Sequence, residues 1–406
     1  MDSKKELPQG WNLKRMPEVV RWSSGGTPKA TERLYYENGT IPWLIIGDLN
    51  DGIVSASATK ITKLGLDNSS AKLIPEGTLL VAMYGSIGKL GITGFECCTN
   101  QAIAFAKELY GVDTKYLFFY LMMIKPKLVQ KGKGGTQKNI SLTVLNSLYI
   151  PLPPLPTQHQ IVSRIESLFA ELNKAVEHLR TAQQQLKIYR QAVLNHWLNN
   201  DDGKWETVKL GEVIEKPTYG TSKKCDYGID GIGVIRIPNI GDGFINDEDL
   251  KYAVFSEEEK EKYSLKNGDL LTIRSNGSVD LVGKCALISC NEEKYLFAGY
   301  LIRLRPNGEK ANSKFLLYTL ESHNLRVQIE EKAKSTSGVN NINSVEIQSL
   351  QISLPPLSDQ QRIVKEIETR LSQAEAAEAR IAEALQKTEA LRQSILKKAF
   401  SGEFDL

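Results

Sequence analysis

The sequence predicts two mixed α/β heads and two long α-helices, arranged as an internal repeat in the order head, helix, head, helix. The first observation is a repeated motif: residues 150–166 read IPLPPLPTQHQIVSRIE, and residues 352–368 read ISLPPLSDQQRIVKEIE. The second is an uninterrupted apolar periodicity of helical type after each copy of the motif. The third is strand-like and turn-like sequence before each copy. With 406 residues, the chain is too long for a single core and suits two domains with connecting helices.

Both heads contain matched predicted strands and one predicted helix. We name residues 1–156 head 1 and residues 201–358 head 2. Predicted strands in head 1 cover residues 43–46, 78–82 and 100–105, and those in head 2 cover 234–237, 269–273 and 300–304. Residues 116–122 and 313–320 favour helix. These elements make each head a mixed α/β domain.

A proline-rich link precedes each long helix. Residues 152–155 and 354–357 both read LPPL, and prolines are excluded from a helix interior. Thr157 and Asp359 are suitable N-caps, so we expect the helices to cover residues 157–200 and 359–402. An SH3-type ligand would be the other interpretation of such proline-rich sequence, but helix capping explains it.

The long helices carry an apolar seam. In the first helix the seam comprises Ile161, Ile165, Leu168, Leu172, Ala175, Leu179, Ala182, Leu186, Tyr189 and Val193. In the second helix Arg370 and Thr388 interrupt the seam, although Leu371 and Leu385 stand beside them. An antiparallel pair within the chain is expected, because head 2 must begin where the first helix ends. A dimer formed through these helices remains the alternative.

Composition excludes several other classes of protein. The five cysteines lack paired CxxC spacing, which argues against a zinc site or a disulfide framework and fits reduced thiols in a cytoplasm. No apolar run is long enough for a membrane helix. The formal net charge of +3 is uninformative, but residues 115–138 carry five lysines after Lys115 and no acidic residue. This cluster is a solvated loop or a contact for an anionic polymer.

Catalytic motifs are missing. The PP pairs follow Leu152 and Leu354 rather than Asp or Asn, so the (D/N)PP(Y/F) methyltransferase motif is absent, as is an FxGxG cofactor loop. Residues 85–89, Gly-Ser-Ile-Gly-Lys, are too short for a P-loop and are followed by Leu90. No HExxH motif and no convincing set of nuclease carboxylates occur. We therefore expect no catalytic residue and no bound metal.

The repeat, the LPPLxxQxxIVxxIE link and the long helix ending in RQxxL resemble the specificity subunit of type I restriction-modification systems. The resemblance covers the whole chain. It implies that the heads are target recognition domains, each reading one half of a split, asymmetric DNA target, and that the helices set the spacing and dock two modification subunits. It also implies that S-adenosylmethionine belongs to the methyltransferase subunits, and ATP and Mg to the restriction subunits.

Three pairs of loops at matched positions are the predicted DNA contacts: first residues 24–29 with 219–224, second residues 84–89 with 274–278 and 283–284, and third residues 133–139 with 335–341. They combine glycines, small polar residues and cations, which suit phosphate contact, with Arg and Asn side chains that suit base edges. An ordinary glycine turn is the alternative for the first loop. The predicted DNA-binding residues of head 1 are Thr27, Lys29, Tyr84, Ser86, Lys89, Lys133, Thr136, Gln137 and Lys138. Those of head 2 are Thr221, Lys223, Lys224, Arg236, Asn239, Arg274, Asn276, Ser278, Lys284, Ser337, Asn340 and Asn341.

Large apolar residues at the helix ends are predicted to dock the partner subunits. Trp197, Leu198 and Phe400 are expected on the outer faces of the helices, where they would need a partner's surface. A different class of function, a coiled-coil adaptor with two protein-binding heads, stays open. The different side chains at matched loop positions and the lysine-rich loop favour DNA recognition over the adaptor.

Overall fold

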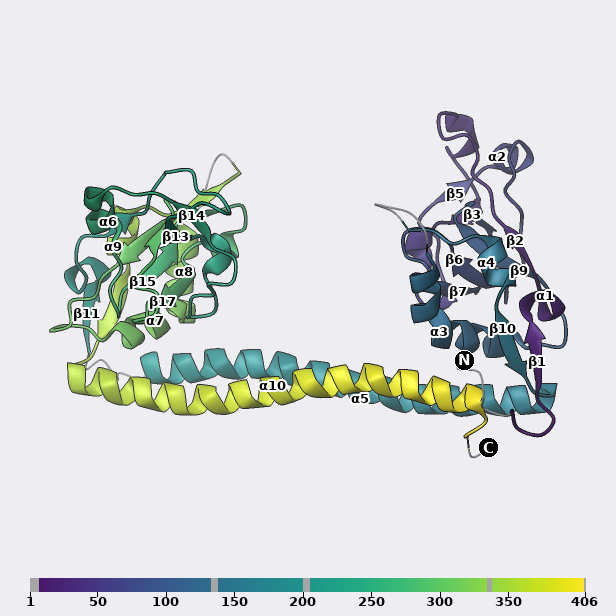
Figure 1. Cartoon of the computed structure of the whole chain (residues 1–406). Helices are drawn as coiled ribbons and strands as arrows, with labels where there is room; N and C mark the ends of the chain where they lie inside the picture. Colours follow the sequence, from purple (N-terminus) through teal and green to yellow (C-terminus); the bar gives the residue numbers. More distant parts are fainter. Residues whose placement is uncertain (1–6, 133–137, 200–204, 334–337, 405–406) are drawn as a thin grey trace. The chain divides into compact units, whose positions relative to one another are not determined.

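The computed structural model describes residues 7–132, 138–199, 205–333 and 338–404. The chain divides into two compact units, one formed by residues 1–179 with 383–406 and the other by residues 180–382. Each unit contains one head, one end of the first long helix and the opposite end of the second. Each head therefore packs on both long helices: head 1 on the start of the first and the end of the second, and head 2 on the end of the first and the start of the second (Figure 1).

Head 1 is built on two mixed sheets. The larger sheet has the order β2-β9-β6-β7-β4 and the smaller has the order β5-β3-β8. The strands are β2 (Val20–Ser24), β3 (Ile41–Leu44), β4 (Gly52–Val54), β5 (Lys60–Ile61), β6 (Leu79–Ala82), β7 (Leu90–Thr93), β8 (Cys98–Thr99) and β9 (Ile103–Leu109). Short helices α1 (Met16–Val19), η1 (Arg33–Tyr35), η2 (Ile46–Asp48), α2 (Lys63–Asp67) and α4 (Leu142–Asn146) connect them. The three strands predicted from the sequence are confirmed, with small changes in their bounds.

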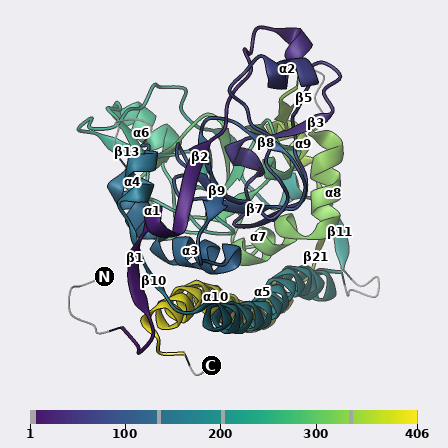
Figure 2. The same ribbon diagram turned by 90° about the vertical axis from the view of Figure 1, so that its right-hand side faces the viewer.

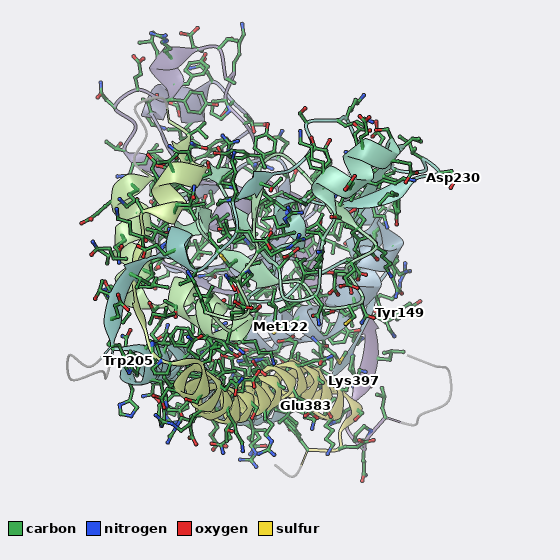
Figure 3. All side chains as sticks on the ribbon, turned by 90° about the vertical axis from the view of Figure 1, so that its left-hand side faces the viewer. Met122, Tyr149, Trp205, Asp230, Glu383 and Lys397 are labelled. Atoms are coloured by element: carbon green, nitrogen blue, oxygen red, sulfur yellow. The ribbon has the colours of Figure 1, made fainter. Side chains whose placement is uncertain are left out.

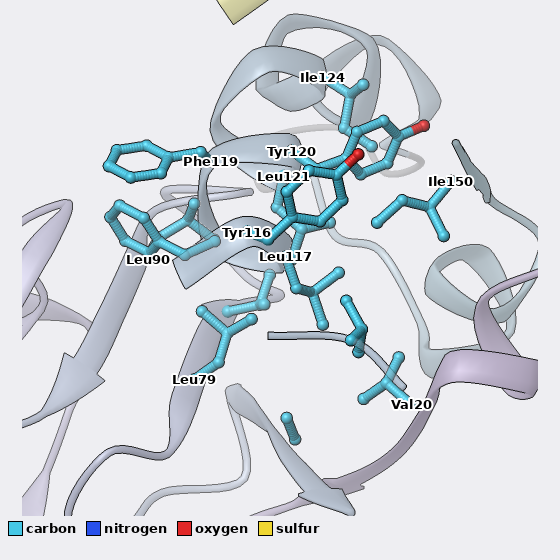
Figure 4. Packing of buried hydrophobic residues seen from close by; sticks show 14 of the residues in the cluster. Val20, Leu79, Leu90, Tyr116, Leu117, Phe119, Tyr120, Leu121, Ile124 and Ile150 are labelled. Atoms are coloured by element: carbon cyan, nitrogen blue, oxygen red, sulfur yellow. The ribbon is translucent and has the colours of Figure 1, made fainter. Parts of the chain in front are cut away.

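Helix α3 (Thr114–Lys131) lies between the larger sheet of head 1 and the long helices (Figure 2). Its start is capped by Asp113, whose carboxylate accepts a hydrogen bond from the backbone N–H of Tyr116 at 2.9 Å. Leu117, Leu121 and Ile124 point into the core together with Tyr116, as the close-up in Figure 4 shows. The buried side chains of α3 therefore pack in one core with apolar residues of the long helices.

Head 2 repeats this plan with a shorter main sheet. Its sheets have the orders β12-β19-β15-β17 and β14-β13-β18. The strands are β12 (Thr218–Tyr219), β13 (Ile232–Ile235), β14 (Lys251–Ala253), β15 (Leu270–Ile273), β16 (Ser275–Asn276), β17 (Cys285–Leu287), β18 (Leu296–Phe297), β19 (Leu301–Leu304) and β20 (Asn340–Asn341). The helices are η3 (Leu210–Glu212), η4 (Ile237–Asn239), α6 (Glu257–Tyr263), η5 (Val279–Leu281), α7 (Ser313–Glu321), α8 (His323–Lys332) and α9 (Ser344–Gln348).

Each head closes on a two-stranded ribbon next to its link. In head 1, β1 (Asn12–Arg15) pairs antiparallel with β10 (Tyr149–Leu152), and Asn12 lies opposite Leu152. In head 2, β11 (Glu206–Lys209) pairs in the same way with β21 (Gln351–Leu354), and Glu206 lies opposite Leu354. Trp205 lies at the base of head 2, beside the helices, and Asp230 lies at its far tip (Figure 3). The equal register of the two ribbons shows that the repeat extends to the first strand of each head.

The two long helices are α5 (Leu155–Leu198) and α10 (Leu357–Ser401). Both begin two residues before the predicted N-caps Thr157 and Asp359, so those predicted helix starts are wrong. The first helical hydrogen bonds run from Gln158 N to Pro154 O and from Gln360 N to Pro356 O, each at 3.0 Å. Pro156 is tolerated inside α5 because a proline in the first turn has no intrahelical N–H bond to lose.

Helices α5 and α10 pair antiparallel within the chain, as predicted. Arg392 donates a hydrogen bond to Asn173, and Arg190 forms an ion pair with Glu375 at 3.7 Å, so residue numbers rise along one helix as they fall along the other. Most of the predicted seam is buried or half-buried, but Ala175 and Tyr189 are exposed. Near its ends the seam packs on the heads: Ile161 and Ile165 belong to the core of head 1, and Ile363 and Ile367 to the core of head 2.

Candidate nucleic-acid interface

The second and third predicted loops lie side by side in each head. In head 1, Tyr84 forms an antiparallel bridge with Asn139. In head 2, β16 pairs with β20, so that Asn276 lies opposite Asn340 and Ser275 opposite Asn341. Segments far apart in the sequence therefore meet at one edge of the head, and they meet in the same way in both heads.

Arg274 of head 2 corresponds in space to Met83 of head 1, one residue before the predicted match with Tyr84. The backbone bonds that define this match are Met83 N to Ala102 O (2.8 Å) and Ile140 N to Met83 O (2.9 Å) in head 1, and Arg274 N to Tyr300 O (2.9 Å) and Ile342 N to Arg274 O (2.8 Å) in head 2. The loop that follows is longer in head 2. It covers residues 274–283 in head 2 and 83–88 in head 1, because Lys284 and Lys89 accept the equivalent backbone bonds from Ile273 and Ala82.

In head 1 these loops border a cavity of about 400 Å³. Three predicted contacts, Ser86, Lys89 and Lys138, are among the residues that line it, together with Lys125 and Asp51. Lys125 is paired with Asp51, with Nζ and Oδ2 2.7 Å apart. Gly88 has φ of +73°, a conformation that disfavours a side chain, so the tight turn depends on glycine. Tyr84 is exposed at the rim.

In head 2 a cavity of about 560 Å³ collects four cations: Lys223, Arg236, Lys251 and Arg274. Thr221 also lines it, and Tyr300 stands exposed at its edge. Three predicted DNA contacts from different loops, Lys223, Arg236 and Arg274, are thus brought together. Tyr300 was not among the predicted contacts. It directly precedes β19, and an exposed aromatic side chain at such a position is a signal of a binding surface.

The glycines of the first loop have a structural role in both heads. A Cβ atom on Gly25 would overlap the carbonyl oxygen of Thr99, and one on Gly220 would overlap that of Phe297. Close backbone packing therefore explains these glycines, in line with the ordinary-turn interpretation. Beside them, Thr27 is exposed and donates a hydrogen bond to Gln101, and Lys29 is exposed.

Several predicted contacts of head 2 are already engaged within the chain. Asn239 is buried: its Oδ1 accepts from Arg236 N at 2.8 Å, and its Nδ2 donates to two backbone carbonyls, so its predicted role in DNA binding is not compatible with its position. Thr221 is also buried and caps the turn at Lys223. These two residues stabilise the loops through hydrogen bonds and do not face solvent.

The cations of head 2 differ in how strongly they are paired. Lys223 contacts Glu259 at 2.7 Å, Arg236 contacts Asp249 at 3.2 Å, and Lys284 contacts Asp242 at 2.8 Å. The hydrogen bond from Lys284 holds the pKa of Asp242 below its usual range. Lys224, in contrast, projects into solvent with 91% of its side chain exposed, 3.6 Å from Asp226.

The remaining predicted residues of head 2 shape its long loop. Asn276 accepts a hydrogen bond from Ser278 N at 2.9 Å, and Asn340 donates to the carbonyl of Gly277 at 3.0 Å. Asn341 accepts from Arg274 Nε at 3.3 Å. Lys133, Thr136, Gln137 and Ser337 lie outside the described residues.

The expectation that Trp197, Leu198 and Phe400 lie on outer helix faces is wrong. Phe400 is 0% exposed and its ring contacts those of Tyr116 and Tyr120 in the core of head 1. Leu198 is buried in the core of head 2, and Trp197 is half-buried against that core. The cause is the length of the helices: their last turns continue beneath the heads, so these side chains fill the chain's own interior.

A buried glutamine in each motif joins head and helix, and the sequence analysis missed its role. The amide of Gln158 donates to Gly111 O (3.0 Å) and Pro153 O (2.8 Å) and accepts from Asp113 N (2.8 Å). In head 2, Gln360 repeats all three bonds, to Lys310 O, Pro355 O and Asn312 N, at 3.0, 2.8 and 2.8 Å. Its recurrence in both copies of the motif was the available signal.

Neither a metal site nor a membrane-spanning helix is found in the part of the chain that the structure describes. No group of three or more His, Cys, Asp or Glu side chains is placed to hold a metal ion there. No described helix is sufficiently long and apolar to cross a bilayer. All five cysteines are free thiols.

Comparison with known proteins agrees with the repeat. A model of the family described as "Type I restriction modification DNA specificity domain" matches the chain twice, over residues 8–179 and 202–387. The StySPI specificity subunit of Salmonella potsdam is 28% identical over 98% of this chain and 90% of its own length. The EcoKI specificity subunit of Escherichia coli K12 is 26% identical over the same shares, 98% and 90%.

Solved structures share the fold. A chain from a study of complex assembly and conformational transition of the type I R-M system aligns with a TM-score of 0.78, at 21% identity over 98% of this chain and 100% of that one. The HsdS subunit from Thermoanaerobacter tengcongensis aligns with a TM-score of 0.57, also at 21% identity, over 99% and 100%. With the family match over both repeats, these findings show that the chain belongs to the specificity subunits of type I restriction-modification systems, the non-catalytic DNA-recognition components of those complexes.

Proposed function

We propose that this chain reads a bipartite, asymmetric DNA target, with one half-site read by each head, and that it positions adenine-methyltransferase and restriction subunits on that target. In this proposal residues 1–156 and 201–358 are the recognition domains, and residues 157–200 and 359–402 are the spacer helices. The observation that carries it is the contrast between the framework that the two heads share and the different side chains on it: matched loops meet in both heads, but Arg274 stands where head 1 has Met83. Two unlike rims on one framework suit two unlike half-sites.

The proposed contacts fall into two groups. Exposed cations such as Lys29, Lys138 and Lys224 suit the phosphate backbone, which supplies most of the affinity but little sequence information. Side chains in the two cavities, among them Ser86 and Arg274, suit base edges. Binding should therefore fall steeply with salt, whereas preference for the target should depend on the cavity residues.

The chemistry belongs to the proposed partners. Two modification subunits would supply the adenine N6 methyltransferase with its S-adenosylmethionine, and restriction subunits would supply ATP- and Mg-dependent translocation and cleavage. Such a complex would act on chromosomal DNA in the cytoplasm. Because Phe400 and Leu198 are buried in the chain's own cores, docking would use exposed helix residues, among them the apolar Ile188 and Leu391.

The test is to co-express the chain with its modification subunit in a methylation-free host and to sequence the genome by a method that detects N6-methyladenine. One split, asymmetric motif methylated on both strands is expected. If the complex assembles and no new methylation appears, the proposal fails, and protein-binding heads become the better explanation.

The spacer role of the helices has its own test. One heptad is inserted in α5 after Leu179 and one in α10 after Ala382, where both insertions leave the head cores untouched. A longer gap between two unchanged half-sites is expected, since a helix grows by about 1.5 Å per residue. A changed half-site with an unchanged gap would refute the spacer role.

A further inference from the structure

Arg274 is held on several sides in head 2. Its Nε donates to Asn341 Oδ1 at 3.3 Å, and the centre of its guanidinium lies 4.7 Å from the centre of the Tyr219 ring. The hydroxyl of Tyr219 in turn accepts a hydrogen bond from Ser344 N at 2.8 Å, which fixes the ring. The backbone of Arg274 is anchored as well, through Tyr300 O and Ile342 N. The plane and direction of the guanidinium are therefore set before any ligand binds.

The end of this side chain faces the cavity with its donors unused. Arg274 is half-buried and lines the 560 Å³ cavity, and within the described part of the chain its Nη1 and Nη2 have no hydrogen-bond partner. The other three cations of the cavity are next to carboxylates: Lys223 with Glu259, Arg236 with Asp249 and Lys251 with Asp226. Arg274 is thus the cation of this cavity that is prepared for an external acceptor.

A fixed guanidinium fork matches two acceptors in one plane. Guanine presents such a pair in the major groove, O6 and N7, and this is the edge that arginine reads bidentately. A phosphate also accepts from arginine, but phosphate contact does not require a preset plane, and the exposed Lys224 suits it better. Stacking on Tyr219 and the bond to Asn341 restrict the rotation of the fork, as base reading requires.

Head 1 has the surrounding framework without this side chain. Met83 occupies the position of Arg274 and is 5% exposed in the core of the head. Tyr219 lies in β12, which pairs with β19 in the same way as β2 pairs with β9 in head 1. The residue of β2 that matches Tyr219 is Ser24, which has no aromatic ring. Asn139 stands where head 2 has Asn341. The guanidinium fork and its aromatic platform are therefore properties of head 2.

From these contacts we infer that Arg274 reads a guanine in the half-site of head 2, with Tyr219 and Asn341 as positioning residues, and that head 1 makes no such contact from the matching position. The inference rests on the proposed function and deepens it, since it names the base and the head. It assigns a guanine·cytosine pair to one half of the target.

The test compares the methylated motif of the wild-type complex with that of Arg274→Ala. The variant is expected to lose its preference for guanine at one position of one half-site by roughly 10- to 100-fold, while the other half-site stays unchanged. Arg274→Lys should lose the preference as well, because an ammonium lacks the planar fork. Gel filtration of each complex and thermal unfolding of each variant establish that the assemblies are intact.

Two further variants separate positioning from general effects. Tyr219→Phe keeps the ring and should retain the guanine preference, whereas Tyr219→Leu should weaken it at the same position. Lys224→Ala should lower methylation of all sites uniformly and leave the motif unchanged.

The outcomes distinguish the inference from the function that supports it. A wild-type complex without a split motif defeats the proposed function. Where the wild-type complex has a split motif, Arg274→Ala can leave that motif unchanged or lower the methylation of all sites equally. Either result refutes only the guanine contact and means that Arg274 binds a phosphate or stabilises the fold. A wild-type motif without a guanine·cytosine pair in either half would do the same.

Discussion

Head 1 and head 2 make the same contacts to the helices and differ in their interiors and in their rims. Both use a buried glutamine, Gln158 or Gln360, with the same three hydrogen bonds. Both also place a lysine of the helix next to the sheet against a glutamate of the long helix, Lys115 with Glu166 and Lys314 with Glu368. The comparison shows that the joint to the helices is the fixed part of the repeat and that the head interiors and rims are the variable part.

One difference lies in the layer between head and helices. Seven residues after the paired lysine, α3 of head 1 carries Met122 and α7 of head 2 carries Glu321. Met122 borders a cavity of about 520 Å³ that Phe169 and Arg392 also line. In head 2 burial raises the pKa of Glu321 to about 7, an effect that nearby Asp242 reinforces and Arg190 and Lys284 oppose. Head 2 thus has a half-buried carboxyl group with a raised pKa where head 1 has a thioether beside a cavity.

Head 2 contains a buried ion pair that has no equivalent among the described residues of head 1. Arg305 binds both carboxylate oxygens of Asp269 at 2.7 Å, and the Asp269 side chain is 1% exposed. Thr78 and Lys107 occupy the matching strand positions of head 1. Asp269→Ala should therefore destabilise head 2 by roughly 3 to 5 kcal/mol, because an unpaired guanidinium would remain half-buried.

Urea unfolding followed by hydrogen exchange in each head measures this effect. The matched change in head 1, Thr78→Ala, removes one hydrogen bond, from its hydroxyl to Pro75 O, and should cost about 1 kcal/mol. Equal losses in the two heads would contradict the asymmetry.

Replacing the buried glutamine should affect both heads alike. Gln158→Leu or Gln360→Leu leaves one N–H and two carbonyl groups without their partner, which should cost roughly 2 to 4 kcal/mol at the corresponding joint. The neighbouring exposed residues, Gln160→Leu and Gln361→Leu, are the controls and should change stability little. A large effect in one head alone would show that the joint is not a shared feature.

The half-buried Glu321 predicts a pH dependence specific to head 2. Its folded pKa of about 7 exceeds the usual 4.5, so the folded state binds the proton more tightly than the unfolded state. Relative to Glu321→Gln, wild-type stability is highest below pH 4.5 and falls as the pH rises through 7, by at most about 3 kcal/mol. Unfolding of both proteins at pH 5 and pH 8 measures this difference in stability. If the wild type were more stable relative to Glu321→Gln at pH 8 than at pH 5, the raised pKa of Glu321 would be refuted.

The smallest expected effect concerns the exposed ion pairs. Lys115→Ala and Lys314→Ala should each cost less than about 1 kcal/mol, and by similar amounts, because both lysines and their glutamates are exposed and screened by solvent. Thermal unfolding at low and high salt measures them. A salt-independent loss of several kcal/mol in either head would mean that the lysine stem packs into the joint.

The fold could be predicted from the sequence because its signals are periodic and repeated. The seam from Ile161 to Val193, the two LPPL links and the alternating strands fixed the order of elements, and the structure confirms the antiparallel pair. The helix starts were misjudged by two residues because Thr157 and Asp359 were taken as N-caps, whereas the chain is already helical from Leu155 and Leu357.

The site was harder to predict because hydrogen bonds between distant residues decide which side chains are available. Asn239 and Thr221 looked suitable for DNA, yet both are buried caps within the fold. The availability of the Arg274 fork depends on Tyr219 and Asn341, which lie far from it in the sequence. Likewise, Phe400 looked exposed because its partners Tyr116 and Tyr120 belong to head 1, at the other end of the chain.

The methylated motif of a chimera tests most directly whether the chain is one shared framework with two independent readers. Residues 12–152, between the paired ends of β1 and β10, are replaced by residues 206–354, between the equivalent ends of β11 and β21. The assembled complex is expected to methylate a target with the half-site of head 2 at both ends and the original gap between them. An unchanged asymmetric motif, or a new sequence in the half read by the untouched head, would contradict it.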